Sequence, residues 1–232
     1  MPEYAAHGSH QVESRLRVYH QGGLDTYCAF YAVLNLVNFL KFKEDTEKGD
    51  FIGADEFKEF RLFINAGGLT GYFPESPLGD EGLRAPMLIG VLSGAFEHFR
   101  LRCSAVIQDD PSVEPMDKSH WDKFFRYGTE KPFSSPQMVD QVLGLAVVKE
   151  DDKDHLGHWV VLVGKSHLKG TAILCEDHWD GIVLDSDRGY ERWRVATEGK
   201  TKLPRVFIRR GAETGELPID WIYSFISVSQ VG

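Results

Sequence analysis

The longest hydrophobic segment of the chain covers residues 25–42, where apolar side chains leave only a narrow polar strip at Asn35, Asn38 and Lys41. Apolar residues on nearly all sides of a helical period are typical of a helix buried inside a protein. The pattern therefore predicts a buried central helix in the first fifth of the chain.

Turn and capping residues mark where this helix begins. Gly22 and Gly23 are followed by Asp25 and Thr26, and either of these two side chains can accept the free backbone N–H groups of a first helical turn. Cys28 therefore falls in the first turn of the predicted helix.

The rest of the first hundred residues predicts further helices. Residues 54–64 and 83–99 have helical spacing of apolar positions, and they flank a loop rich in Gly and Pro at residues 66–82. Such a loop more often covers a cleft than contributes to a core. Residues 100–107 predict a strand, and residues 108–136 have no regular pattern.

The character of the chain changes after residue 142. Short apolar or alternating runs, separated by Gly, Asp, Lys and Pro, follow one another at 142–148, 158–163, 171–175, 181–185, 205–208 and 221–228. This spacing predicts an antiparallel sheet. Helices first and strands later indicate the α+β class. We expect one two-lobed domain over residues 1–232, with a helical part at about 1–100 and a β part at about 101–232.

Composition narrows the class of protein. The 232 residues are 42% hydrophobic and 26% charged, which excludes disorder as the main state. The net charge of −9 disfavours a nucleic-acid partner, because affinity for phosphate backbones comes from clustered Lys and Arg.

Three features that the sequence lacks predict the cellular compartment of the protein. No apolar run approaches the roughly 20 residues that cross a bilayer, so no membrane association is expected. The first residues lack the basic and apolar regions of a secretory signal. The three cysteines, Cys28, Cys103 and Cys175, are too few and too scattered for a disulfide framework. We expect a cytoplasmic protein, or one exported without a classical N-terminal signal.

Cys28 is the candidate nucleophile. The unpaired N–H groups and aligned peptide dipoles of a helix N-terminus favour negative charge, so a thiol in the first turn ionises more readily. The preceding Gly22 and Gly23 let a ligand approach the backbone, and Gln21 stands seven positions upstream. The alternative for Cys28 is an ordinary buried cysteine.

His158 is the candidate base. It begins an apolar run that ends at Gly164, so its imidazole would lie at the edge of a buried strand and face a cleft. A cysteine at a helix start with a histidine about 130 residues later on a strand is the order found in papain-like enzymes. Trp159, next to the proposed base, is expected to form a wall of the cleft.

Two carboxylates compete to orient the imidazole. Asp185 ends a predicted strand, where a carboxylate can accept a hydrogen bond from the histidine of a neighbouring strand. Asp177 is closer to His158 in sequence and is the alternative. Asp187 is a third candidate, although it is more typical of a turn.

Three segments together resemble the papain-like cysteine peptidase superfamily. They are Gln21 to Ala32, Gly157 to Gly164 and Ile182 to Asp185, about thirty residues in all. Among its branches, the compact bacterial C39-type peptidases are the most similar. The resemblance implies a papain-like fold with a helical lobe, whose central helix starts at the cysteine, and a β-sheet lobe. It further implies Cys28 as nucleophile, His158 as general base and acid, Asp185 as orienting carboxylate and Gln21 as a donor to the oxyanion hole.

The expected function is a thiol protease that cleaves a peptide or isopeptide bond through a thioester. The same residues would also serve deamidation or transamidation of a protein glutamine, and a papain-fold binding module without activity is a further alternative. Only 27 residues precede Cys28, too few for an inhibitory prodomain, so we expect selectivity for one protein or peptide substrate.

Polar residues that crowd residues 155–187 raise the possibility of a metal site. The spacing of His155 and His158 lacks the helical H-E-x-x-H pattern, and there is no paired Cys and His set. A nucleotide site is equally unsupported, because no Lys follows Gly22 and Gly23 in the pattern of a phosphate-binding loop. We expect neither a metal nor another cofactor.

Overall fold

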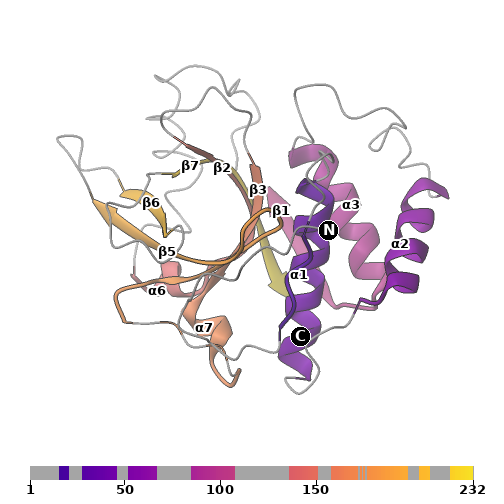
Figure 1. Ribbon diagram of the computed structural model, residues 1–232, viewed down its shortest axis with the longest axis horizontal. Helices are drawn as coiled ribbons and strands as arrows, with labels where there is room; N and C mark the ends of the chain where they lie inside the picture. The colour runs from indigo at the N-terminus through magenta and orange to yellow at the C-terminus, as the bar shows by residue number, and fades with distance from the viewer. Residues whose placement is uncertain are drawn as a thin grey trace, which may run out of the picture.

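The computed structural model describes residues 16–20, 28–45, 52–66, 85–107, 136–150, 158–171, 173, 175, 177–197, 204–209 and 220–231. Three helices lie beside one curved sheet (Figure 1). The helices are α1 (Cys28–Glu44), α2 (Ala54–Ala66) and α3 (Ala85–His98). Helices therefore come first along the chain, and the sheet is built from later residues.

All seven strands of the sheet pair in antiparallel fashion. In spatial order they are β1 (Cys103–Ile107), β7 (Asp220–Gln230), β2 (Leu143–Glu150), β3 (His158–Gly164), β4 (Gly181–Asp185), β5 (Gly189–Thr197) and β6 (Pro204–Arg209). Although β6 is the last strand in this order and β7 the second, the two approach each other. The sheet therefore curves toward a barrel (Figure 1). Two short helices, α6 (Pro136–Asp140) and α7 (Lys165–Leu168), flank β2 and β3 in sequence.

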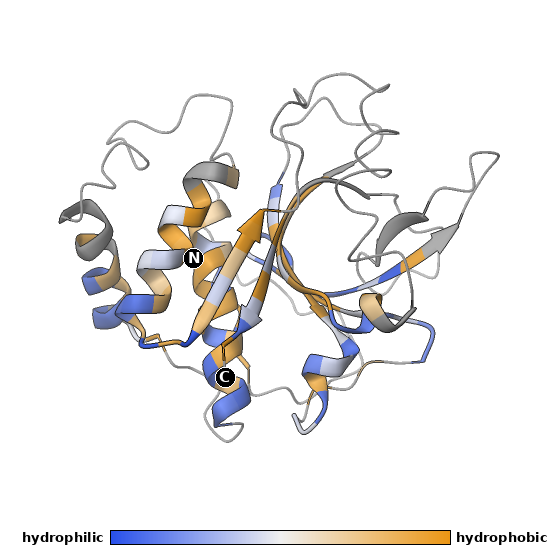
Figure 2. Ribbon diagram, turned by 180° about the vertical axis from the view of Figure 1, so that it is seen from behind, coloured by the Kyte–Doolittle hydropathy of each residue, from blue (hydrophilic) through white to orange (hydrophobic). Residues whose placement is uncertain are grey.

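The core consists of two clusters that β3 separates. Trp159, Val161 and Val163 belong to the larger cluster, together with most of the buried side chains of α1 and α3. Val160 and Leu162 belong to the smaller cluster on the other face of the sheet. A strand that is buried on both faces is apolar at every position, which explains the uninterrupted apolar run of β3. Figure 2 shows hydrophobic residues along the inner helices and strands, while the outer helix α2 carries hydrophilic ones.

The predicted α+β class is confirmed, and so are most of the predicted elements. The predicted strand at 171–175 is wrong for the residues described there, since Thr171, Ile173 and Cys175 are not in a strand. The Thr171 hydroxyl donates to the Leu168 carbonyl and accepts from the Ile173 N–H. Local side-chain bonds of this kind compete with a sheet ladder, so the segment turns instead.

Other predicted features fall partly outside the described residues. These are the capping turn before Cys28, the loop at 67–82 and the irregular segment at 108–135. The strand β5 was not predicted, although charged residues alternate with apolar ones along it as in a half-buried strand. Within the described ranges, no helix combines the length and the apolarity that a membrane crossing requires.

Candidate active site

The helix α1 and the strand β3 run in the same direction, which brings their first residues together. At the far end of both elements, Lys43 of α1 contacts His167 of α7, with Nζ 3.3 Å from Nδ1. His167 donates its other ring N–H to the Gln141 carbonyl at 3.0 Å, and α7 follows β3 directly. Because these later ends meet, the starts at Cys28 and His158 lie at the same opposite end of the molecule, the upper end in Figure 1.

The period of the strands places His158 and Asp185 on one face of the sheet. His158 stands two positions before Val160, and Asp185 two positions after Val183, and both of these valines belong to the smaller core cluster. Alternate residues of a strand share a face. Since β3 and β4 are hydrogen-bonded neighbours, the two polar side chains meet at the rim of the sheet.

A short hydrogen bond joins this pair. The Nε2 atom of His158 lies 2.7 Å from Oδ1 of Asp185, and Asp185 is only 2% exposed. The same Oδ1 accepts the backbone N–H groups of Asp187 at 2.7 Å and Arg188 at 3.4 Å. The turn between β4 and β5 therefore holds the carboxylate in place while the carboxylate holds the ring.

The surroundings of Asp185 keep its carboxylate charged. Burial on its own raises the pKa of this group. The hydrogen bond and charge of His158, the N–H of Asp187 and the charge of Arg188 outweigh burial, so the pKa is lowered. The ionised carboxylate accepts a hydrogen bond from Nε2–H of His158 and stabilises a positive charge on the ring, so Asp185 favours the protonated imidazole.

Cys28 is half-buried as the first residue of α1, and it lies close enough to the His158 ring to raise the pKa of that ring. Since Asp185 occupies Nε2, the nitrogen that remains for the thiol is Nδ1. Burial lowers the pKa of His158, but the hydrogen bonds and charges of Asp185 and Cys28 outweigh it and raise that pKa to about 10. The imidazole is therefore held as a cation between two groups that carry negative charge when ionised.

The remaining predicted site residues occupy different places. Asp177 is exposed, and its backbone carbonyl accepts a bond from the Lys165 Nζ at 2.9 Å. The carboxylate that binds His158 is thus that of Asp185 and not that of Asp177. Trp159 is 3% exposed and packs in the larger core cluster, so it is a core residue with little surface for the cleft wall predicted for it. Gln21 lies outside the described residues.

Sequence reasoning treated the turn after Asp185 as a generic turn and missed what its backbone does. Asp187 is exposed and supplies its N–H, not its carboxylate, to the site. Gly189 closes the turn with φ of +85°, a conformation that suits glycine. The signal that could have revealed this role is the spacing itself, because an Asp that ends one strand stands four residues before a Gly that begins the next.

The other two cysteines are in different environments. Burial and the charge of Glu44 raise the pKa of the Cys103 thiol, against the opposing charge of Lys43, so this thiol stays neutral. Cys175 contacts the Trp179 carbonyl, with its sulfur 3.9 Å from the oxygen. Cys28, by contrast, lies beside a histidine that is itself held by a carboxylate.

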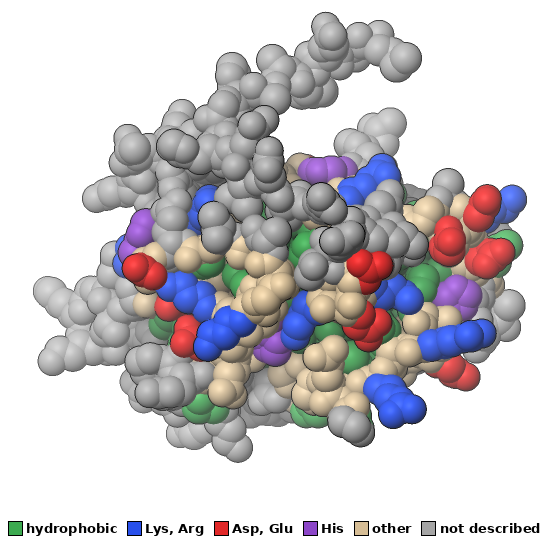
Figure 3. Space-filling view, turned by 90° about the horizontal axis from the view of Figure 1, so that it is seen from below, with side chains coloured by type: hydrophobic (Ala, Val, Ile, Leu, Met, Phe, Trp, Pro, Cys, Tyr) green, Lys and Arg blue, Asp and Glu red, His purple; other side chains and the backbone are tan. Residues whose placement is uncertain are grey.

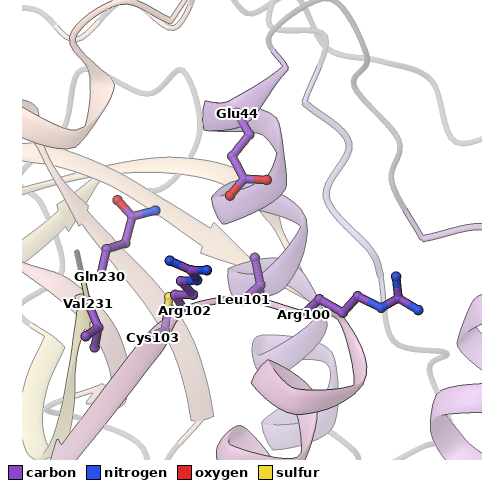
Figure 4. A pocket seen from close by; sticks show the side chains of 7 residues that line it. All are labelled: Glu44, Arg100, Leu101, Arg102, Cys103, Gln230 and Val231. Atoms are coloured by element: carbon purple, nitrogen blue, oxygen red, sulfur yellow. The ribbon is translucent and has the colours of Figure 1, made fainter.

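A hollow of about 410 Å³ opens beside Cys103 at the opposite end of α1 from Cys28 (Figure 4). Its lining consists of Glu44, Arg100, Leu101, Arg102, Cys103, Gln230 and Val231. The described side chains on the lower face of the molecule mix Lys and Arg with Asp and Glu (Figure 3). Among the described residues that line this hollow there is no histidine.

Among the residues that the structure describes, no group of three or more His, Cys, Asp or Glu side chains could hold a metal ion. No protein-family model, curated protein or solved structure matches the chain significantly.

Proposed function

We propose that this protein is a cysteine-dependent hydrolase that cleaves a peptide or isopeptide bond through a thioester. The observation that carries the proposal is the hydrogen bond between His158 and the buried Asp185, with Cys28 beside the same imidazole at the start of α1. A nucleophile, a base and a group that orients the base are the parts this chemistry needs.

Each part has a defined task in the proposed reaction. His158 takes the thiol proton, and the Cys28 sulfur attacks the substrate carbonyl, forming a C–S bond while the carbonyl electrons move to oxygen. As the tetrahedral intermediate collapses, the C–N bond breaks and His158 donates its proton to the departing amine. Water then attacks the thioester with His158 as base, which releases the acid and restores the thiol.

The electrostatics of the site favour the first step. The pKa of about 10 for His158 keeps the imidazolium populated at neutral pH, and this cation lies next to the sulfur that becomes negative. The position of Cys28 at the start of a 17-residue helix adds the positive end of the helix dipole. We assign Gln21 to the oxyanion hole on the sequence resemblance alone.

The arrangement of elements supports a papain-like architecture for this enzyme. A buried helix that begins at the cysteine packs on an antiparallel sheet, and that sheet supplies the histidine and the carboxylate from adjacent strands. Because one fold serves many activities, the proposed hydrolase activity rests on the residues of the site and not on this architecture.

The first experiment measures which thiol is the nucleophile. The intact protein is treated with iodoacetamide at about pH 6, where ordinary thiols are almost entirely protonated, and the modified cysteine is identified by mass spectrometry. We expect Cys28 to react on the order of a hundredfold faster than Cys103 or Cys175, and His158→Asn to abolish this preference. Equal reaction of all three thiols would overturn the proposal.

The second experiment measures catalysis. A pool of fluorogenic peptides and isopeptide-linked substrates is screened with wild-type protein, with Cys28→Ala and with the matched control Cys103→Ala. Turnover should fall by about a thousandfold or more in Cys28→Ala and stay unchanged in Cys103→Ala. Release of ammonia without cleavage would assign the thioester to glutamine deamidation instead.

A further inference from the structure

Residues 16–20 form an extended segment, here called the N-terminal strap, that pairs with side chains and not with a strand. Leu16 and Val18 are buried in the larger core cluster, whereas Arg17 and His20 are exposed. This alternation is that of a β-strand with one buried face. The strap nevertheless takes its main hydrogen bonds from α1 and its neighbours.

Two buried amides of α1 bind the backbone of the strap. Asn35 accepts the Tyr19 N–H at 2.7 Å and donates to the Tyr19 carbonyl at 3.1 Å, as a neighbouring strand would do. Asn38, one turn further along, donates to the Arg17 carbonyl at 2.8 Å. Asn35 is 1% exposed and Asn38 is fully buried. A buried amide is tolerated only when it is hydrogen-bonded, and the strap supplies these partners.

The other side of the strap touches the hairpin that carries Asp185. The hydroxyl of Tyr190, the second residue of β5, donates to the Leu16 carbonyl at 3.1 Å. At Gly189 a side-chain carbon would stand 3.3 Å from the His20 ring, so the strap lies directly against the end of the turn. Both contacts fall within five residues of Asp185 in sequence.

The strap therefore joins the two elements on which the candidate site is built. Cys28 and Asn35 are seven residues apart in α1, which places them two turns apart on one face of the helix. Without the strap, packing of α1 on β3 would still hold the helix against the sheet. Proton transfer between Cys28 and His158 requires a narrower range of distance and angle than packing alone sets, because hydrogen bonds form only within limited distances and angles.

We propose that the N-terminal strap fixes the helix that carries Cys28 against the hairpin that carries Asp185, with Asn35 and Tyr190 as positioning residues. The inference rests on the proposed thiol chemistry. The pairing of His158 with Asp185 is secured by the adjacent strands β3 and β4 and does not depend on the strap. Loosening the strap should therefore move the Cys28 thiol away from the His158 imidazole, while the hydrogen bond between His158 and Asp185 remains.

The test measures the iodoacetamide reaction rate of Cys28 across pH in the full chain. A thiol paired with an imidazolium reacts at similar rates at about pH 6 and pH 9, whereas an ordinary thiol is on the order of a hundredfold slower at the lower pH. We expect Asn35→Ala to reduce the ratio of the rate at about pH 6 to the rate at about pH 9 roughly tenfold. Asn38→Ala removes the second amide bond between α1 and the strap, at Arg17 and further from Cys28, and should reduce the ratio less than Asn35→Ala does.

A second pair of variants changes side chains outside the core, so that a loss of overall stability cannot explain the result. Tyr190→Phe removes only the half-exposed hydroxyl, and Ser104→Ala removes an exposed hydroxyl bond to Ser229 on the distant β1 and β7 strands. Tyr190→Phe should lower the rate ratio about threefold and speed hydrogen exchange of the Asp187 amide, and Ser104→Ala should do neither.

The outcomes separate the two proposals. Wild-type Cys28 that behaves as an ordinary thiol would overturn the proposed function and the strap's role with it. Alternatively, Cys28 of the wild type reacts at low pH while the rate ratio is unchanged in both Asn35→Ala and Tyr190→Phe. This result would overturn the positioning role of the strap and leave the proposed function standing. A fall of the ratio in Ser104→Ala as large as that in Asn35→Ala and Tyr190→Phe would also overturn this role, because a general loosening of the fold would then explain all three.

Discussion

At the scale of single residues, the candidate site depends on one carboxylate oxygen. Oδ1 of Asp185 binds the His158 ring and also the N–H groups of Asp187 and Arg188. The two backbone donors hold this oxygen in place independently of the ring. The pKa of the carboxylate is lowered against burial by His158 first, and then by the N–H of Asp187 and the charge of Arg188. The orientation of the imidazole is thus set by the turn as much as by the carboxylate.

Replacing this carboxylate should change the chemistry of the site more than its shape. Asp185→Asn keeps a side chain of the same size that can bond to the ring, but it removes the charge that favours the imidazolium. We expect the alkylation rate of Cys28 at about pH 6 to fall at least about tenfold, because the thiolate loses its cationic partner. Asp177→Asn is the matched control and should leave the rate unchanged. A larger loss in Asp177→Asn would reinstate the alternative that the sequence left open.

The same pair makes the stability of the fold depend on pH. The pKa of His158 is raised from 6.5 in the unfolded chain to about 10, so its contribution is complete below about pH 6.5 and is lost as the pH rises toward about 10. The pKa of Asp185 is lowered, so its contribution is complete above its ordinary value of 3.8 and is lost as the pH falls below it.

The difference in unfolding free energy between wild type and Asp185→Asn should therefore be largest between about pH 4 and 6.5. Urea unfolding at a series of pH values measures it. The difference should shrink on both sides of this window, and one that grows steadily from pH 6.5 to 10 would contradict the assignment of the raised pKa to His158.

At the scale of elements, the sequence predicted the site better than it predicted what holds the site together. The starts of α1 and β3 and the end of β4 were all predictable, because periodicity and strand ends are local signals. The strip of Asn35 and Asn38 was also visible, but a sequence cannot tell a polar strip that faces water from one that binds a buried segment. The structure shows the second case, since both amides are satisfied by the strap.

The turn between β4 and β5 offers a prediction at this scale, with a control inside the chain. Gly189 and Gly170 both have positive φ, +85° and +81°, but only Gly189 faces another group, the His20 ring. Gly170→Ala should cost about 1 kcal/mol of unfolding free energy from backbone strain alone. Gly189→Ala should cost more, and it should also slow the reaction of Cys28 at low pH. If the two variants lose the same unfolding free energy and Cys28 reacts as in the wild type, the His20 side chain moves aside at no cost and the contact at Gly189 does not position the site.

At the scale of the whole molecule, β3 ties the two halves of the protein into one unit. Its side chains alternate between the cluster shared with the helices and the smaller cluster inside the curve of the sheet. Neither cluster persists without this strand, because each loses central members when β3 leaves the sheet. The site lies at the first residue of the same strand, so the site and both clusters should be lost together.

This arrangement predicts a single unfolding transition in spite of the division into helices and sheet. Leu162→Ala removes a fully buried side chain from the smaller cluster only and should cost about 2–5 kcal/mol. If β3 couples the clusters, the midpoint should fall by the same amount for the helical circular-dichroism signal and for the fluorescence of Trp159 and Trp193, which lie on opposite faces of the sheet. Iodoacetamide reactivity of Cys28 at low pH should vanish at that same midpoint. A helical signal that keeps the wild-type midpoint would mean that the helices fold on their own, and that the sheet presents His158 and Asp185 to an already folded helix.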